Sequence, residues 1–273
     1  MDDANLYLHP LQQEMYNVLA KAGFDDSEDR PKLFIDGRRV NLETEIGALK
    51  GTAARLNSTN DKTFPDIAGR LDVEHLSIGE MRGADLSALA NCKRLTHLHI
   101  NWATKLSDLT VLRTFGALTF LEIEDAPKIE SIEPIGALTN LRWLCYRGGI
   151  WNANHVDTLE HIAGLSNLEA LVLHNFKVNE GGLKPLAVLK SLRFLALSNQ
   201  FETEDYAYLS IQLPETQCAQ FAAYQQGNDS TYGDIMVTGK RKPFLKSHDP
   251  KDQGRLEKYV TDFKKLQDRF RSI

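Results

Sequence analysis

The sequence predicts an α/β solenoid, in which short repeats place their strands side by side in one parallel sheet. Two observations predict this fold. First, a phrase with apolar first, fourth and sixth residues occurs six times, beginning at Val73, Leu95, Leu118, Leu141, Leu168 and Leu192. These first residues lie 22, 23, 23, 27 and 24 positions apart. Second, apolar residues between the phrases recur at every third position, as at Leu183, Leu186 and Leu189, which is the period of a 3₁₀ turn.

An apolar phrase of this form, repeated about every 20 to 29 residues, is typical of leucine-rich repeats. The chain resembles that family over residues 71–225, with six clear repeats and one degenerate one. Residues 106–112 (LSDLTVL) are similar to the short bacterial type seen in internalins. The resemblance implies a leucine-rich-repeat solenoid with a parallel β-sheet on its concave side and 3₁₀ turns or short helices on its convex side.

One feature departs from the family pattern. Leucine-rich repeats usually carry an asparagine just after the phrase, and its side chain links neighbouring turns. Those positions are held here by Met81, Ala103, Ala126, Gly149, Phe176 and Gln200. We therefore expect the backbone groups of these turns to find other hydrogen-bond partners. Asn175 and Asn199 lie one residue before the usual asparagine position, and we expect them to take its place locally.

Residues 1–70 contain no phrase and are predicted to form an N-terminal capping region. A helix ending at Gly23 is predicted from one apolar face, made by Leu11, Met15, Val18 and Leu19. Residues 32–40 predict a hairpin around an Asp-Gly turn. A second helix is predicted from Ile46, Leu49, Ala53 and Leu56. Such a block would cover the open edge of the first repeat, and a separate binding domain is the alternative.

Residues 226–273 are predicted to form a C-terminal strand and helix cap. Before them, residues 209–221 are interpreted as a decayed seventh turn. A strand is predicted at Ile235–Val237, and a final helix begins near Asp249. The apolar stripe of this helix consists of Leu256, Tyr259, Val260, Phe263, Leu266 and Phe270. We expect the stripe to fold back over the last repeat; a free amphipathic helix offered to a partner is the alternative.

Composition and charge limit the classes of function. The net charge of −5 disfavours a dedicated nucleic-acid binder. Residues 237–273 carry eleven Lys and Arg against five Asp and Glu, which indicates either a charge-laced solvated helix or a tail for an acidic partner. The three cysteines have no pairing pattern, and no signal peptide or membrane-spanning run is evident. We expect a soluble, cytoplasmic protein, monomeric and without cofactors or contacts with membranes.

The third, fifth and seventh residues of each phrase are predicted to face the concave side, because side chains alternate along a strand. The third-position row is His75, His97, Phe120, Trp143, Ala170 and Phe194. The fifth-position row is Ser77, His99, Glu122, Cys145, Val172 and Ala196. The seventh-position row is Gly79, Asn101, Glu124, Arg147, His174 and Ser198.

These rows predict a protein-binding face, because exposed aromatic clusters and Trp, Tyr and Arg side chains mark interaction sites. The predicted partner-binding residues are Trp102, Phe120, Glu122, Glu124, Trp143, Arg147, His97, His99, His174 and Phe194. The alternative is that the caps fold over the face and bury its aromatic residues. By analogy with small repeat proteins, we expect a bacterial immunity or inhibitor protein, or a scaffold.

Two other classes of function have some support in the sequence. A metal-binding protein or metal-dependent enzyme is the alternative suggested by His75, His97, His99 and Glu122, whose side chains are plausible ligands for zinc. Cys145, near Glu122 and His174, is a candidate nucleophile. However, the sequence lacks the common catalytic and nucleotide-binding motifs. We therefore expect no enzymatic activity.

Overall fold

The structure, a computed structural model, describes residues 33–37, 49–50, 53–228 and 231–272. The predicted helix ending at Gly23 lies outside the described residues, as does the second strand of the predicted hairpin. Among the described residues, no helix is long and apolar enough to cross a membrane.

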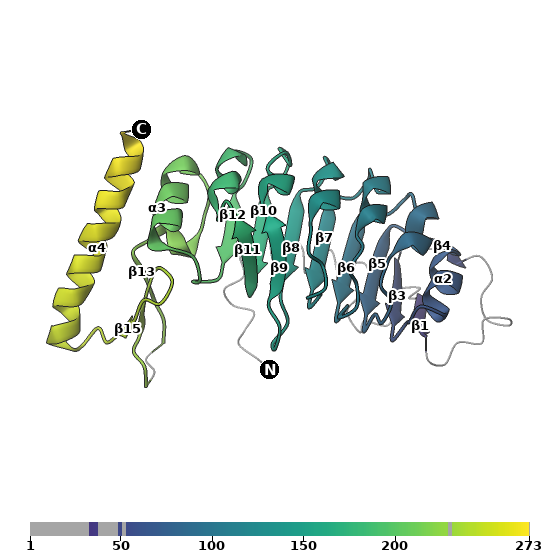
Figure 1. The fold of residues 1–273 in the computed structure, drawn as a ribbon, viewed down its shortest axis with the longest axis horizontal. Coiled ribbons are helices and arrows are strands. Elements are labelled where there is room, and N and C mark those ends of the chain that lie inside the picture. Colours follow the sequence, from purple (N-terminus) through teal and green to yellow (C-terminus); the bar gives the residue numbers. More distant parts are fainter. Residues whose placement is uncertain (1–32, 38–48, 51–52, 229–230, 273) are drawn as a thin grey trace.

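One parallel sheet runs the length of the solenoid (Figure 1). Its eight strands follow chain order: β1 (Leu33–Asp36), β3 (Ala53–Asn57), β5 (His75–Gly79), β6 (His97–Asn101), β7 (Phe120–Glu124), β8 (Trp143–Arg147), β10 (Ala170–His174) and β12 (Phe194–Leu197). Six of these strands belong to the six phrases, which confirms the predicted leucine-rich-repeat fold.

The core lies behind this sheet, where equivalent residues of successive phrases stack. Strands β5 and β6 pair with Leu76 opposite Leu98 and Ile78 opposite Ile100, and the same register continues to β10. Leu98 and Ile100 are fully buried. Because every repeat contributes the same two positions, the apolar side chains form one continuous core rather than separate small ones.

The convex side is built from 3₁₀ helices, as the three-residue period predicts. They are η3 (Ser87–Asn91), η4 (Thr110–Thr114), η5 (Glu133–Ala137), η6 (Glu160–Ile162) and η7 (Lys184–Val188). Their backbone bonds span three residues, for example from the Leu112 N–H to the Leu109 carbonyl at 2.9 Å. Apolar residues at every third position therefore point back into the core.

The predicted second helix around residues 46–56 is wrong. Leu49–Lys50 (β2) pairs with Leu71–Asp72 (β4), and β3 joins the main sheet with Ala54 opposite Leu76. β1 then pairs with β3 in the same parallel sense. Pairing along a pre-existing sheet edge overrides a helical spacing of four apolar residues. The main sheet therefore begins before residue 71, although the first complete phrase begins only at Val73.

The longest spacing between phrases contains a second small sheet that the sequence did not predict. β9 (Asn154–Thr158) pairs in parallel with β11 (Phe176–Glu180). Val156 and Phe176 are fully buried, so the extra residues add an outer strand pair to the core. Period-two patterning of Asn154–Thr158 is weak, which explains why it was missed.

The turns after the strands satisfy their backbone groups through left-handed residues and two asparagines. Glu80 and Asp125 have positive φ angles of 50° and 51°, and their N–H groups donate to the carbonyls of Asn101 and Arg147 on the next strand. The Asn175 side chain donates to the Gly149 carbonyl at 2.7 Å, and that of Asn199 donates to the Val237 carbonyl at 2.8 Å. The expected local substitution is confirmed for Asn175, whereas Asn199 joins the last repeat to the C-terminal region instead of to a neighbouring turn.

The C-terminal end replaces the 3₁₀ turn by longer elements. Helix α3 (Thr203–Gln212) follows β12, and Gln217 forms a single parallel bridge with Phe194, as expected for a decayed turn. Next, β13 (Tyr224–Gln226), β14 (Ile235–Val237) and β15 (Phe244–Leu245) form an antiparallel sheet. The strand predicted at residues 235–237 is confirmed.

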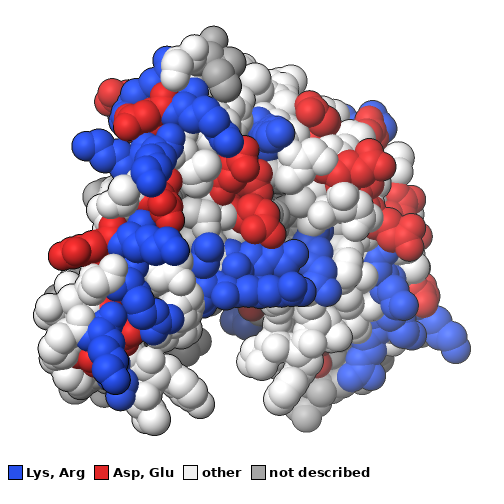
Figure 2. Space-filling view, turned by 60° about the vertical axis from the view of Figure 1, so that its left-hand side comes forward, with Lys and Arg blue, Asp and Glu red and all other residues white. Residues whose placement is uncertain are grey.

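The final helix, α4 (Pro250–Arg271), is N-capped by Asp249 and packs against α3. Phe263 is buried, Phe270 packs edge-on against Tyr208, and Gln267 donates to Ser210 at 2.8 Å. Figure 2 shows Lys and Arg gathered along this end of the molecule, with Asp and Glu interleaved. Three basic side chains of α4 pair with acidic residues three positions earlier in the same helix.

Candidate functional site

Four rings of the third-position row contact one another across neighbouring strands on the concave side. Their ring centroids lie 4.4 Å apart between His75 and His97, 5.6 Å between His97 and Phe120, and 6.0 Å between Phe120 and Trp143. The last two pairs are nearly parallel, with interplanar angles of 19° and 12°. The parallel register sets this geometry, because it places the third residue of each phrase directly beside the next.

The prediction that this aromatic row is exposed is wrong for its two central members. Phe120 is 4% exposed and Trp143 is 6% exposed. Stacking covers both faces of Phe120, by His97 on one side and Trp143 on the other. With Cys145, Ala170 and Val172 these rings form a second apolar cluster, against which Phe194 packs half-buried.

A charged cluster lies beside the rings, on strands β7 and β8. The Arg147 guanidinium is 3.0 Å from a carboxylate oxygen of Glu122 and 3.0 Å from one of Glu124. Glu122 is 5% exposed, so its negative charge depends on a nearby cation. Arg147 therefore holds two carboxylates of the adjacent strand in fixed positions.

His99 extends this cluster onto β6. Its Nδ1 lies 3.1 Å from Ser77 Oγ, and its Nε2 lies 3.9 Å from a Glu122 oxygen. Burial lowers the pKa of His99, although Glu122 and Glu124 act in the opposite direction. The imidazole is therefore neutral at physiological pH.

The structure brings together one set of potential metal ligands on this face. Among the described residues, His99, Glu122 and Glu124 form the only group of three whose ligand atoms all lie within 4.8 Å of one another. The predicted set differs, because His75 and His97 contact each other edge to face in the neighbouring row instead of converging on Glu122. Arg147 already supplies a cation to both carboxylates.

The most accessible residues of the concave side lie in the seventh-position row and on the rim beyond it. Glu124 and Arg147 are half-buried, and His174 is exposed. Beyond the strand ends, Trp102 is 54% exposed and Trp151 is 91% exposed. The accessible predicted residues therefore lie nearer the strand ends than Phe120 and Trp143 do.

Cys145 has the wrong environment for a nucleophile. It is buried in the apolar cluster beside Trp143 and Val172. Burial, reinforced by the charge of Glu122, raises the pKa of the Cys145 thiol well above its usual range. The reactive thiolate is therefore not populated at neutral pH.

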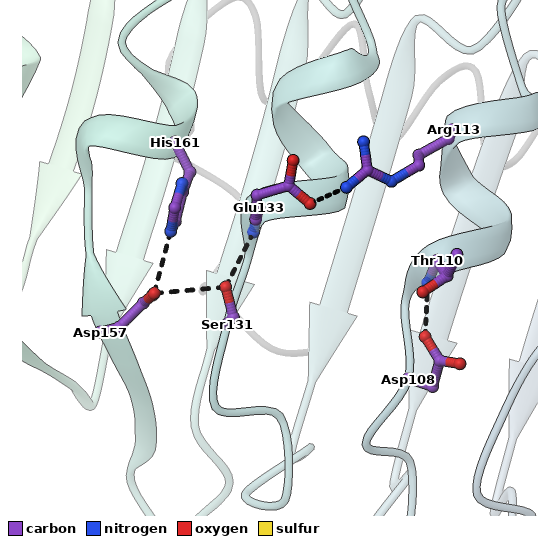
Figure 3. Close-up of polar contacts among 7 residues, drawn as sticks. All are labelled: Asp108, Thr110, Arg113, Ser131, Glu133, Asp157 and His161. Atoms are coloured by element: carbon purple, nitrogen blue, oxygen red, sulfur yellow. Dashed lines mark hydrogen bonds and ion pairs between the residues drawn. The ribbon is translucent and has the colours of Figure 1, made fainter.

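The convex side has a separate polar depression of about 490 Å³ beside η4 and η5. Figure 3 shows polar contacts in this region: Asp157 accepts from His161 at 2.9 Å and from Ser131 at 3.3 Å, and Arg113 pairs with Glu133. Ser131 contacts the carboxylate and not the imidazole, so these residues do not form a nucleophile–base pair. Their contacts instead join neighbouring turns.

Comparisons with known proteins show the fold. No protein-family model matches the sequence, and no curated protein matches it significantly in sequence. An internalin, InlF of Listeria monocytogenes, matches in structure with a TM-score of 0.50 and 24% identity, over 63% of this chain and 48% of that chain. This chain thus spans about half the length of that internalin.

Two further solved structures are similar. Internalin C2 of Listeria monocytogenes matches with a TM-score of 0.47 and 23% identity, over 61% of this chain and 70% of that chain. A leucine-rich-repeat protein of Leptospira interrogans matches with a TM-score of 0.33 and 14% identity, over 77% and 70%. From its six stacked phrases and its likeness to InlF, the chain has the leucine-rich-repeat solenoid fold of the internalin type.

Proposed function

We propose that the chain is a non-enzymatic module that binds another protein through the concave side between β6 and β12. The observation that carries this proposal is the seventh-position row, which presents Glu124, Arg147 and His174 along one continuous sheet. The buried Glu122 carboxylate pairs with Arg147, and Arg147 pairs with Glu124, so this part of the surface is ordered before a partner arrives. A pre-ordered surface loses less entropy on binding than a flexible one.

The chemistry of the face favours binding over catalysis. The thiol of Cys145 is protonated and buried, and the Glu122 carboxylate is neutralised by Arg147. Neither group is poised to attack a substrate. A long open surface of charges and half-buried rings instead matches the extended contacts that repeat proteins make with protein partners.

The proposal also includes a specific biological role for this binding. Within the cytoplasm, a monomer of this size would act as an immunity or inhibitor protein, or as a scaffold. The support is fold analogy and the ordered charged face, which would orient a charged partner. The acidic net charge supports a protein over a nucleic acid as the partner.

Partner capture with a matched pair of arginine variants tests the concave side. Arg147→Ala with His174→Ala changes accessible concave residues, whereas Arg113→Ala removes a paired arginine from the convex side. We expect tagged wild type and Arg113→Ala to recover the same protein from cells of the source organism, and the concave variant to lose it. Equal recovery by the folded concave variant would remove this face from the proposal.

Metal binding is the second candidate function, favoured by the convergence of His99, Glu122 and Glu124 within 4.8 Å. A divalent ion would have to displace Arg147 from both carboxylates. Elemental analysis after reconstitution with zinc separates the two functions. Stoichiometric zinc that is lost in His99→Ala would support the metal site, and its absence from wild type would dismiss it.

A further inference from the structure

A patch of exposed apolar side chains lies on the rim where the strands of the main sheet end. Trp102 follows β6, and Ile150 and Trp151 follow β8. Ile150 is 88% exposed, and both tryptophans are also largely exposed. Carboxyl ends of parallel strands meet at one edge of a sheet, so these residues belong to the same rim, with Asp125 after β7 between them.

Trp102 occupies a backbone conformation that is unfavourable for a bulky residue. Its φ angle is 52°, in the left-handed region. The equivalent residue of other turns is Ser58, Glu80, Asp125 or Asn175, all with positive φ. Asp and Asn tolerate this conformation better than Trp does. An exposed indole gains little packing in return, so the folding of this chain does not explain a tryptophan here.

Acceptor atoms next to Trp102 lack donors. Asn101 Oδ1 and Asp125 Oδ1 are buried side-chain oxygens with no hydrogen-bond partner within the part of the chain that the structure describes. A buried acceptor without a donor costs roughly 1 to 3 kcal/mol. Both oxygens lie below the surface of the rim, and the half-buried Asp125 carboxylate is the acidic group that the rim presents to a partner.

The rim also carries a negative charge that no ion pair among the described residues balances. Arg147 pairs with Glu122 and Glu124. Asp125 has no ion-pair partner among the described residues, and its carboxylate lies against the backbone of Gly149 in the β8 turn. The unpaired negative charge thus lies between the turns that carry Trp102 and Trp151.

We propose that this rim binds an arginine side chain of the partner protein. A guanidinium supplies N–H donors for the half-buried Asp125 carboxylate, carries the compensating charge, and stacks on indole faces. Lysine provides the charge but not the planar group. This inference rests on the proposed protein-binding function and specifies the chemistry of the partner.

Fluorine NMR of the full chain labelled with 5-fluorotryptophan tests the rim directly. The chain has three tryptophans, so Trp102, Trp143 and Trp151 give three signals, assigned with Trp→Phe variants. The probe is a Gly/Ser peptide with arginine at every third position, and its control replaces each arginine by the neutral isostere citrulline. We expect saturable shifts of the Trp102 and Trp151 signals with arginine only, while the buried Trp143 signal stays in place.

A matched pair of aspartate variants separates a specific site from general attraction to an acidic protein. Asp125→Asn should weaken the peptide affinity about three- to fivefold, as expected for the loss of one charge pair at the protein surface. Asp66→Asn, the same change at an exposed position in α2 (Thr63–Ala68), should leave it unchanged. Equal shifts with citrulline, equal weakening by both variants, or no saturable shift would each overturn the inference.

The outcome is independent of the capture experiment on the concave side. If Arg147→Ala with His174→Ala loses the partner but the arginine peptide shifts neither rim tryptophan, the proposed function stands and the rim inference fails. If the peptide binds the rim while the concave variant still recovers the partner, the rim inference stands and the concave-side proposal fails.

Discussion

The third-position and seventh-position rows come from the same strands, only four residues apart, yet they differ in exposure and chemistry. In the third row, His97, Phe120 and Trp143 stack, and the last two are buried. In the seventh row, Arg147 and His174 remain accessible. Both rows face away from the main core, so the side of the sheet does not by itself determine exposure.

This difference indicates that the third-position row contributes to stability, while the residues near the strand ends are available for binding. Large rings one strand apart cover each other and form a second apolar cluster. Charged side chains near the strand ends stay in contact with water and with one another. We therefore expect substitutions in the third row to change stability and those near the rim to change binding.

The largest expected effect is on the stacked row. Trp143→Ala should lower the free energy of unfolding by about 3 kcal/mol, because it removes a buried ring and leaves a cavity. Trp151→Ala, at a 91% exposed side chain, should change it by less than about 0.5 kcal/mol. Urea unfolding followed by circular dichroism measures both. Similar losses in the two variants would contradict the division between row and rim.

The next effect concerns the charged cluster between the rows. Arg147→Met should lower the free energy of unfolding by about 2 kcal/mol, because the buried Glu122 loses its cation. Adding Glu122→Gln should recover part of that loss, since no buried charge then remains unpaired. A double-mutant cycle in urea measures the coupling. Additive losses would show that Arg147 contributes by packing alone.

A smaller effect is expected from pH. Burial lowers the pKa of His97 from 6.5 to about 4, so the unfolded chain binds more protons between these values. Stability should therefore fall as the pH drops from about 6.5 to 4. Since the ring is part-exposed, His97 contributes only about 1 kcal/mol after screening. Urea midpoints at pH 7.5 and 5 should differ less in His97→Phe than in wild type; equal differences would exclude His97 as the source.

The smallest effect has the opposite sign. Trp102→Asn should raise the free energy of unfolding by about 0.5 to 1 kcal/mol, because asparagine tolerates the positive φ angle of this turn. The same change should weaken arginine-peptide binding at the rim. Thermal unfolding and peptide titration of one sample compare the two effects. Lower stability of Trp102→Asn would show that the indole packs productively in the free chain.

The repeats were predictable because their signal is periodic. The six phrases predicted six strands of the main sheet, and the three-residue spacing predicted the 3₁₀ turns. The apolar stripe from Leu256 to Phe270 predicted α4. β3 and β9 were not predictable in this way, because neither contains the full apolar phrase. Ala53–Asn57 carries two alanines and one leucine, a composition without a strong strand preference, and it becomes a strand by pairing with β5.

The candidate site was predicted only in part. Alternation along a strand correctly assigned Glu122, Glu124 and Arg147 to the concave side, and the register brings them together. Their pairing and the left-handed conformation of Trp102 gave no sequence signal. The unpartnered oxygen of Asp125 results from the packing of the turns, which the sequence alone does not show.

By itself, the sequence determined the solenoid, its sheet register and which residues share each row, because these follow from the period of side chains along a repeated strand. Only the tertiary structure decided which members of a row are buried and which charges are paired. Burial and pairing depend on distances between neighbouring strands and on how side chains cover one another. As a result, Phe120 and Trp143 form a buried stacked pair on the concave side, whereas Trp102 and Trp151 lie exposed on the rim.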